Sequence, residues 1–478
     1  MACKKKVRKM KKIEVHAWVH VFENDNDALI PEVWAQESLM ILESNMVVAN
    51  LVHRDFEPEI AQFGDTVHTN RPGTFKSIRK TDSDEVQDQD ASATDVEVKL
   101  NQWHHVTFII KDGEETKSFK SLVTYHLEPA LTAIAEAIDE VLLCQVYEFM
   151  GTSAGKLGTD PTKSTTIALR EAMTKNKCPL GGRNVIITPD TEGAILNIDD
   201  FTQADKIGDD GTTLREANLG RRMGFNWFTC HNTPNVASGS TTVAGAINNG
   251  DGYAADSTSL TVDGFSAAIT NGSWCTVAGD MTPQMITATV GGATPTSLTI
   301  TPGLKSAVVD DAVVTVYSPG AINYASDYAS GYEKALTVDG FSVAPKAGQL
   351  MTIGSGSTVA KYGIINSVDT NGTATPSTTE ILPNRPLDAA AADDAVVGLG
   401  PAGGFNFAFH RNALALVSRP LATPAQGTGA LSYVANYNGL AVRVTITYDG
   451  KAQGHRVTID LLCGVKTLDA NLGAVLYA

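Results

Sequence analysis

Ser259-Leu-Thr-Val-Asp-Gly-Phe-Ser266 recurs almost unchanged as Ala335-Leu-Thr-Val-Asp-Gly-Phe-Ser342. Two further pairs follow in the same order: Ala293-Thr-Pro-Thr-Ser297 with Ala374-Thr-Pro-Ser-Thr378, and Asp310-Asp-Ala-Val-Val314 with Asp393-Asp-Ala-Val-Val397. Because chance rarely preserves order, these matches predict a duplicated module of roughly 60–70 residues. The duplication separates the middle of the chain from the two segments that flank it.

The duplicated copies have the composition of small all-β modules. Short runs of alternating apolar and polar residues are separated by Asp-Gly, Asn-Gly and Gly-Gly pairs, which are typical of turns between strands in a sandwich or barrel. We place the copies at about 259–319 and 335–402, within an inserted region of 236–403.

The flanking segments alternate between helix and strand patterns, which is typical of a domain that contains both. A helix is predicted for Pro31–Leu51, and a longer one for Ser121–Met150, where apolar residues recur at steps of three and four and Gly151 offers a C-cap. Arg183–Pro189 predicts a buried strand that ends in a turn. Leu440–Tyr448 and His455–Cys463 predict a final strand pair.

A long β-hairpin is predicted between the two helices. Strand patterns at Phe63–Ile78 and Val96–Ile110 flank an acidic, polar tip at Thr81–Asp95. A hairpin with a polar tip cannot bury its own faces, so we expect it to lie on a neighbouring subunit. Complementary charges would set the register of that contact. The candidate subunit-interface residues are Lys76, Arg79, Lys80, Asp82, Asp84, Glu85, Asp88 and Asp90.

The bulk composition limits the classes of function. With 478 residues and 43% hydrophobic content, the chain can form two to four domains, and no apolar run is long enough to span a bilayer. The net charge of −16 disfavours tight nucleic-acid binding, because phosphate contacts need basic side chains. The six scattered cysteines predict reduced thiols rather than a disulfide scaffold.

The first twelve residues are strongly basic. They are predicted to form a solvated tail, with contact to RNA, DNA or an acidic partner as the alternative. Glu14, His16 and His20 interrupt the apolar segment that a signal peptide would need.

Motifs that would carry chemistry are weak. Gly151-Thr-Ser-Ala-Gly155 matches the serine-hydrolase pattern, but a helix precedes the serine where a strand is required. His104-His105 and Cys230-His231 are adjacent pairs, whose side chains point to opposite faces of a strand and do not chelate readily. We therefore predict no catalytic, cofactor-binding or metal-binding residues, and no enzyme.

The flanking segments resemble the major capsid proteins of tailed phages, which have the Hong Kong 97-type fold, and in particular coat proteins of short-tailed phages with an inserted β domain. The resemblance covers about Leu29 to Asn235 and Gly404 to the end of the chain. The first 27 or so residues and the doubling of the β module depart from it. The segments that carry the resemblance are Leu29–Ala35, the hairpin of Asp65–Lys120, Leu180–Pro189, Leu219–Phe225 and Phe407–Ala415.

The resemblance implies an α+β fold with the family's named parts. In this sequence these would be a basic N-terminal extension (1–28), a helical N-arm (29–62), an extended hairpin (63–120), a spine helix with peripheral domain (121–164), the first part of an axial domain (165–235), inserted duplicated β modules (236–403), the return of the axial domain (404–430) and the C-terminal strands of the peripheral domain (431–478).

The resemblance also implies a function. Such a chain would self-assemble, on a scaffolding protein in the bacterial cytoplasm, into pentamers and hexamers of an icosahedral virion shell. The shell would meet a portal, enclose double-stranded DNA without binding it specifically, and carry possible decoration proteins, with no membrane and no cofactor. The alternative is a secreted or surface β-repeat adhesin or glycan-binding protein. No aromatic cluster supports glycan binding by the modules, since Trp274 has few tyrosines near it.

Overall fold

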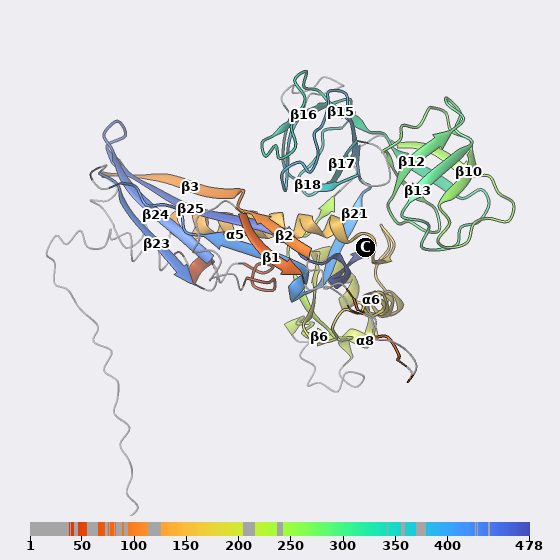
Figure 1. Ribbon diagram of the computed structural model, residues 1–478, viewed down its shortest axis with the longest axis horizontal. Coiled ribbons are helices and arrows are strands. Elements are labelled where there is room, and N and C mark those ends of the chain that lie inside the picture. Colours follow the sequence, from red (N-terminus) through yellow and green to blue (C-terminus); the bar gives the residue numbers. More distant parts are fainter. Residues whose placement is uncertain are drawn as a thin grey trace, which may run out of the picture.

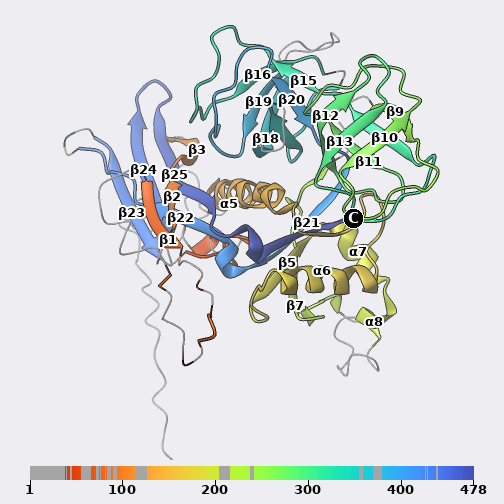
Figure 2. The same cartoon turned by 45° about the vertical axis from the view of Figure 1, so that its right-hand side comes forward.

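The computed structural model describes residues 38, 40–42, 46–54, 66–71, 75, 77–80, 82, 88–89, 94–112, 126–203, 216–236, 242–341, 343–354, 359–369, 379–425, 427, 429–437 and 440–478. The predicted basic extension, 1–28, lies outside the described residues. In the described part, the chain forms an elongated sheet backed by one long helix, a compact sheet flanked by shorter helices, and two closed barrels (Figures 1 and 2).

The long helix is shorter than its sequence pattern predicts. Helix α5 (Glu128–Leu143) buries Leu131, Ile134, Ile138 and Leu142 along one face, as the spacing requires. The chain then tightens into the 3-10 helix η3 (Cys144–Phe149), so the prediction of one helix up to a Gly151 cap is wrong. The reason is tertiary packing, because η3 is buried almost all round. The predicted start at Ser121 lies outside the described residues.

The helical N-arm is also less regular than predicted. Ser38 and Met40–Leu42 are helical, whereas residues 46–52 form turns and bends. The predicted helix therefore does not continue to Leu51.

The elongated sheet extends from the compact part and lies along α5 (Figure 1). It is antiparallel, and its long central strand β25 pairs with β24, β22 and β3. Its inner face supplies Val444, Ile446, Val457 and Ile459 to the core that α5 shares. The strands are β3 (Gln102–Lys111), β22 (Leu414–Arg419), β23 (Leu431–Tyr437), β24 (Leu440–Asp449) and β25 (Gly454–Thr467).

The compact sheet contains the predicted buried strand, β5 (Arg183–Ile187), all five residues of which are buried. Its neighbours are β21 and, in parallel, β7. The other strands of this sheet, with the two neighbours just named, are β4 (Ser153–Gly155), β6 (Arg221–Arg222), β7 (Phe225–Thr229), β8 (Asn235–Val236), β21 (Gly403–His410) and β26 (Gly473–Tyr477). The helices of this part are α6 (Lys163–Lys175), α7 (Pro189–Leu196) and α8 (Asp199–Thr202). Two short 3-10 helices are η4 (Arg411–Ala413) and η5 (Ala470–Leu472).

Two closed six-stranded barrels lie between β8 and β21 in the chain. Each has its own apolar core. The first is formed by β9 (Thr242–Ile247), β10 (Ser259–Asp263), β11 (Trp274–Val277), β12 (Gln284–Val290), β13 (Ser297–Thr301) and β14 (Val313–Tyr317). The second is formed by β15 (Gly320–Ile322), β16 (Leu336–Asp339), β17 (Leu350–Ile353), β18 (Lys361–Asp369), β19 (Thr379–Pro383) and β20 (Val396–Leu399).

Each barrel begins one strand before the repeated phrase. β9 and β15 precede β10 and β16, and each pairs with the strand of the phrase that follows it. The predicted module starts of about 259 and 335 therefore lie one strand too late, although Gly245-Ala-Ile-Asn248 and Gly320-Ala-Ile-Asn323 at these first strands are identical. No helix in the described part of the chain is long and apolar enough to cross a membrane.

Candidate assembly surface

The predicted hairpin is formed by β1 (Thr66–Arg71) and β2 (Thr94–Lys99), joined by six antiparallel pairs. Val67 and Val98 are buried and pack against Ala415 and Val417 of β22. The two valines give the base of the hairpin an apolar inward face. The base is therefore anchored on its own chain, and the expectation of a neighbouring subunit beneath it is wrong for this part.

The second leg of the hairpin is shorter than predicted. The pattern of Val96–Ile110 is divided between β2 and β3, and β3 pairs with β25 rather than with β1. The change of partner occurs at Leu100 and Asn101, which lie between the two strands.

Four of the eight candidate interface residues are described, and all four are exposed: Arg79, Lys80, Asp82 and Asp88. They follow the end of β1 at Arg71, beyond the valines that anchor the hairpin. Lys76, Asp84, Glu85 and Asp90 lie outside the described residues. A contact of these charges with a neighbouring subunit stays a prediction.

Strand β3 provides a surface that the sequence did not single out. Its outer face exposes Trp103, His105, Thr107 and Ile109, while the alternate residues turn inward. Trp103 is 59% exposed and Ile109 is 38% exposed. Tryptophan is enriched in protein interfaces and is costly to leave in water, so this face is suited to a partner.

The same outer face is fixed by polar contacts between strands. The Arg443 guanidinium donates to the Asp460 carboxylate, with Nε 2.9 Å from Oδ1 and Asp460 only 2% exposed. Thr107 and Thr458 hydroxyls lie 3.1 Å apart. These contacts hold β3, β25 and β24 as one stiff unit.

Asp139 of α5 holds the N-terminal segment. Its carboxylate accepts backbone N–H groups of Val47 (2.8 Å), Val48 (3.3 Å) and Ala49 (3.1 Å). Burial raises the pKa of Asp139, and the three N–H donors oppose that rise. The contact fixes residues 47–49 against α5.

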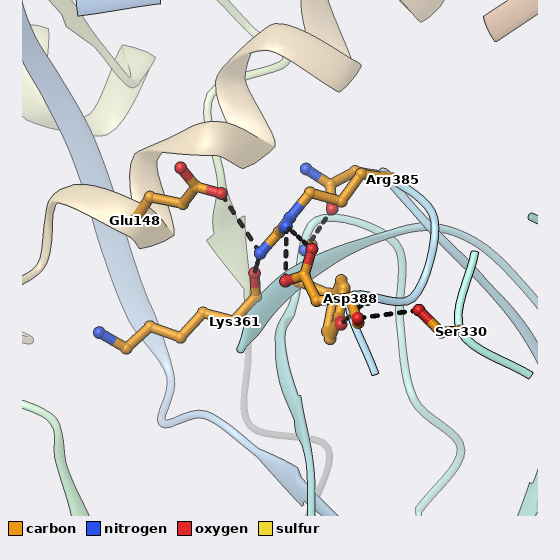
Figure 3. A network of polar contacts seen from close by, with 8 residues as sticks. Glu148, Ser330, Lys361, Arg385 and Asp388 are labelled. Atoms are coloured by element: carbon orange, nitrogen blue, oxygen red, sulfur yellow. Dashed lines mark hydrogen bonds and ion pairs between the residues drawn. The ribbon is translucent and has the colours of Figure 1, made fainter. Parts of the chain in front are cut away.

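The second barrel is held on η3, which follows α5, by Arg385 (Figure 3). Its Nη2 lies 3.2 Å from Glu148 Oε1 and donates to the Lys361 carbonyl oxygen at 3.1 Å. Its Nη1 lies 2.7 Å from both Asp388 carboxylate oxygens. The Tyr147 hydroxyl also donates to the Gly348 carbonyl oxygen. One arginine thus joins the barrel loop to η3.

The first barrel is attached to the same region of the chain. Leu157 N–H donates to the Met281 carbonyl oxygen at 3.0 Å, and Lys305 Nζ donates to Gly151 O at 3.3 Å. The two barrels also touch each other, since Trp274 Nε1 donates to Thr352 Oγ1 at 3.2 Å. Trp274 is fully buried, so it cannot bind a ligand at the surface.

The remaining motifs do not form a reactive site. Ser153 lies in β4, which pairs with β26, and a 3-10 helix precedes it, which is the reverse of a nucleophile elbow. Cys230 is buried and His231 is exposed, while His104 is half-buried and His105 exposed, so each pair is divided between two faces. Burial lowers the pKa of His104.

The hairpin brings together one group that sequence reasoning missed. His68, Asp95 and Glu97 lie close to one another, and all three are exposed. His68 Nδ1 is 2.8 Å from Asp95 Oδ2, and this hydrogen bond raises the pKa of His68. The cross-strand pairing of β1 with β2 accounts for the group, as a surface ion pair.

No protein-family model matches the chain, and no curated protein sequence matches it. A structure from Mycobacterium phage Che8 is similar at 12% identity and a TM-score of 0.41, with 90% of both chains covered. The capsid structure of the cyanophage P-SCSP1u has 10% identity and a TM-score of 0.40, with 87% of this chain and 84% of that chain covered. The mature capsid of bacteriophage PhiM1 has 8% identity and a TM-score of 0.38, with 87% and 82% covered. Each alignment covers most of this chain, and the second and third structures are phage capsids.

Proposed function

We propose that this chain is the major capsid protein of a tailed bacteriophage, and that its copies self-assemble into the icosahedral shell that encloses the double-stranded DNA genome. The observation that supports this most is the elongated sheet, which extends away from the compact part (Figure 1). Its strand β3 exposes Trp103 and Ile109 on the outer face. The exposed charges Arg79, Lys80, Asp82 and Asp88 follow β1 in the chain, beyond the anchored base of the hairpin. Extended elements of this kind gain their full burial only in an assembly.

The assembly follows from identical subunits with different contacting surfaces. A charged hairpin or β3 face on one copy would meet another patch on the next, and such head-to-tail contacts close into rings when the rotation allows it. The net charge of −16 would leave the enclosed DNA free of tight binding to the wall. Scaffolding and portal proteins are the partners that such an assembly would use.

Coexpression of the chain with its scaffolding protein, followed by negative-stain microscopy, tests the proposal. The expected result is closed shells. Monomers alone, from protein that is folded by circular dichroism, would contradict it.

The β3 face can be tested in the same system. Trp103→Ser with Ile109→Ser removes two exposed apolar side chains and should sharply reduce shells while leaving the monomer folded. Val309→Ser is the matched control, because Val309 is 72% exposed on the first barrel. Equal shell yield from both variants would exclude β3 from the subunit contact.

A further inference from the structure

The second barrel carries a column of three tyrosine rings on the connection between β15 and β16. Tyr324 and Tyr328 stack with centroids 4.6 Å apart at 14°, and Tyr328 and Tyr332 lie 4.6 Å apart at 47°. Tyr324 is 44% exposed, whereas Tyr328 is 3% exposed. The column thus has a buried central ring, Tyr328, and an outer ring, Tyr324, that lies open to solvent.

Internal contacts hold these rings in place. The Tyr328 hydroxyl accepts the Thr337 N–H at 2.9 Å, and the Tyr332 hydroxyl donates to the Ala335 carbonyl oxygen at 3.4 Å. The Tyr324 backbone N–H donates to Asp393 Oδ1 at 2.9 Å, and the Tyr324 ring is held by its stacking on Tyr328. A ring held in this way loses little freedom when a ligand stacks on it.

The first barrel has the same central tyrosine in the same frame. The Tyr253 hydroxyl accepts the Thr261 N–H at 2.8 Å, as Tyr328 accepts from Thr337. The Tyr253 N–H donates to the Val308 carbonyl oxygen at 2.9 Å, and the Tyr328 N–H donates to Ala391 at 2.8 Å. The central tyrosine therefore belongs to the barrel fold itself.

Of the two barrels, the second alone has the outer rings, Tyr324 and Tyr332. Asn249 N–H donates to Asp310 Oδ1 where Tyr324 N–H donates to Asp393. In the first barrel the Ser257 carbonyl oxygen accepts the Leu304 N–H, and in the second the Tyr332 carbonyl oxygen accepts the Leu387 N–H in the same way. Asn249 and Ser257 thus occupy the places of Tyr324 and Tyr332. Because the barrel closes without the two rings, their presence calls for a role outside folding.

The surroundings define the ligand class. The face of an aromatic ring is electron-rich and attracts the weakly positive C–H groups of a sugar ring. Asp327 is exposed near the column and accepts the Asp393 N–H at 2.8 Å, and Glu380 lies near enough to raise the pKa of Tyr332, after the larger effect of burial. Carboxylates accept hydrogen bonds from sugar hydroxyls and repel polyanions.

A polar groove adjoins the column. Ser330 and Gly331, between the second and third tyrosines in the sequence, line a groove of about 520 Å³. Its charged lining residues are the acids Asp95, Glu97 and Asp388 and the bases Lys99, Arg385 and Lys466, so the groove favours neither anions nor cations. Its mixed lining could accept the hydroxyls of further sugar units.

We propose that the tyrosine column of the second barrel is a binding platform for neutral saccharides. One exposed ring among acids is too small a surface for a stable protein contact, which buries about 800 Å² per partner. The inference does not depend on the capsid function, because it concerns one face of one barrel.

The test applies the full-length labelled protein to an array of neutral glycans, followed by titration with the free form of the glycans retained. The double variant Tyr324→Asn with Tyr332→Ser places the residues of the first barrel at both sites, so the fold should accept it. Its affinity should fall roughly tenfold or more, since two stacked rings are lost. Tyr324→Phe keeps the ring and should bind as the parent does.

Two results would overturn the proposal. One is retention of no neutral glycan by the parent, and the other is equal affinity of parent and double variant. A change in the sedimentation of the double variant, with no saccharide effect, would assign the column to a protein contact instead and also overturn it.

Discussion

At the scale of single residues, Asp139 connects segments that lie some ninety positions apart in the chain. One carboxylate accepts three N–H groups, from Val47, Val48 and Ala49. No apolar side chain could satisfy those donors, and a buried donor without a partner is costly. The attachment of residues 47–49 to α5 therefore depends on the Asp139 carboxylate.

Asp139→Asn should lower the free energy of unfolding by about 2–3 kcal/mol, because the amide keeps one acceptor and turns a donor toward an N–H group. Urea titration of the full chain measures the change. Glu136→Gln is the matched control on the same helix, where the side chain is half exposed and little change is expected. Equal effects of both variants would remove the special role of Asp139.

Glu140 should make stability depend on pH. Burial raises its pKa to about 7, above the value of about 4.3 in an unfolded chain. Between these values the unfolded state binds fewer protons than the folded state, so stability falls as the pH rises through this window. Glu140→Gln should flatten that fall in urea titrations at pH 5 and pH 7.5. An unchanged slope would show that Glu140 ionises freely in the folded protein.

At the scale of the elements, the barrels share a close contact between a glycine and a ring. A Cβ at Gly245 would meet the ring of Phe265, and a Cβ at Gly320 would meet that of Phe341. Both aromatic residues belong to the repeated phrase, which explains why Phe265 and Phe341 occupy the same place in the two copies. The phrase thus marks a packing unit of the barrel.

Gly245→Ala should destabilise the first barrel by about 1–3 kcal/mol through overpacking. Thermal unfolding and limited proteolysis measure the effect, with cleavage expected first within 242–317. Gly250→Ala is the control, because no atom lies within 4 Å of the position of its Cβ. Resistance of Gly245→Ala equal to that of the control would mean that Phe265 moves aside without cost.

The elements that could be predicted from the sequence are those with a local signal. The period of Leu131 to Leu142 predicted α5, and the alternation of Leu440–Tyr448 predicted most of β24. Local patterns could not predict that β3 pairs with β25 rather than with β1, because partner choice depends on contacts more than 300 positions apart. Local patterns also could not predict η3, five of whose six residues are buried by tertiary contacts.

The candidate assembly surface was predictable only in part. The charges of the hairpin could be read from the sequence, because they cluster in one polar stretch. The outer face of β3 could not, since Trp103 and Ile109 acquire an outward side only once the register with β25 is set. The tyrosine column depends on spacings of four residues in a loop, which resemble no regular strand.

At the scale of the whole molecule, the position of the second barrel depends on Arg385. Its side chain is 13% exposed, and that of Glu148 is 22% exposed, so the pair is largely removed from water. Removing one partner of such a pair leaves the other desolvated and unpaired. The orientation of the barrel relative to η3 is thus sensitive to a single charge.

Arg385→Met and Glu148→Gln should each destabilise the chain, and the double variant should lose less than the sum of the two. We expect a coupling energy of about 1 kcal/mol or more, obtained from urea titrations of the four proteins. Hydrogen exchange of the barrel loop at Asp388 should rise in Arg385→Met. Additive losses would assign the docking of the barrel to Tyr147 and the apolar contacts around it.

The pairing of β8 with β21 has a consequence for the history of the chain. Asn235 and Val236 lie opposite Gly404 and Gly403, so the polypeptide departs from the compact sheet and rejoins it at adjoining rungs. An insertion whose two ends lie at neighbouring positions of a sheet can grow from one barrel to two without distorting that sheet. A foreign domain inserted between Val236 and Gly403 would therefore leave the compact sheet intact.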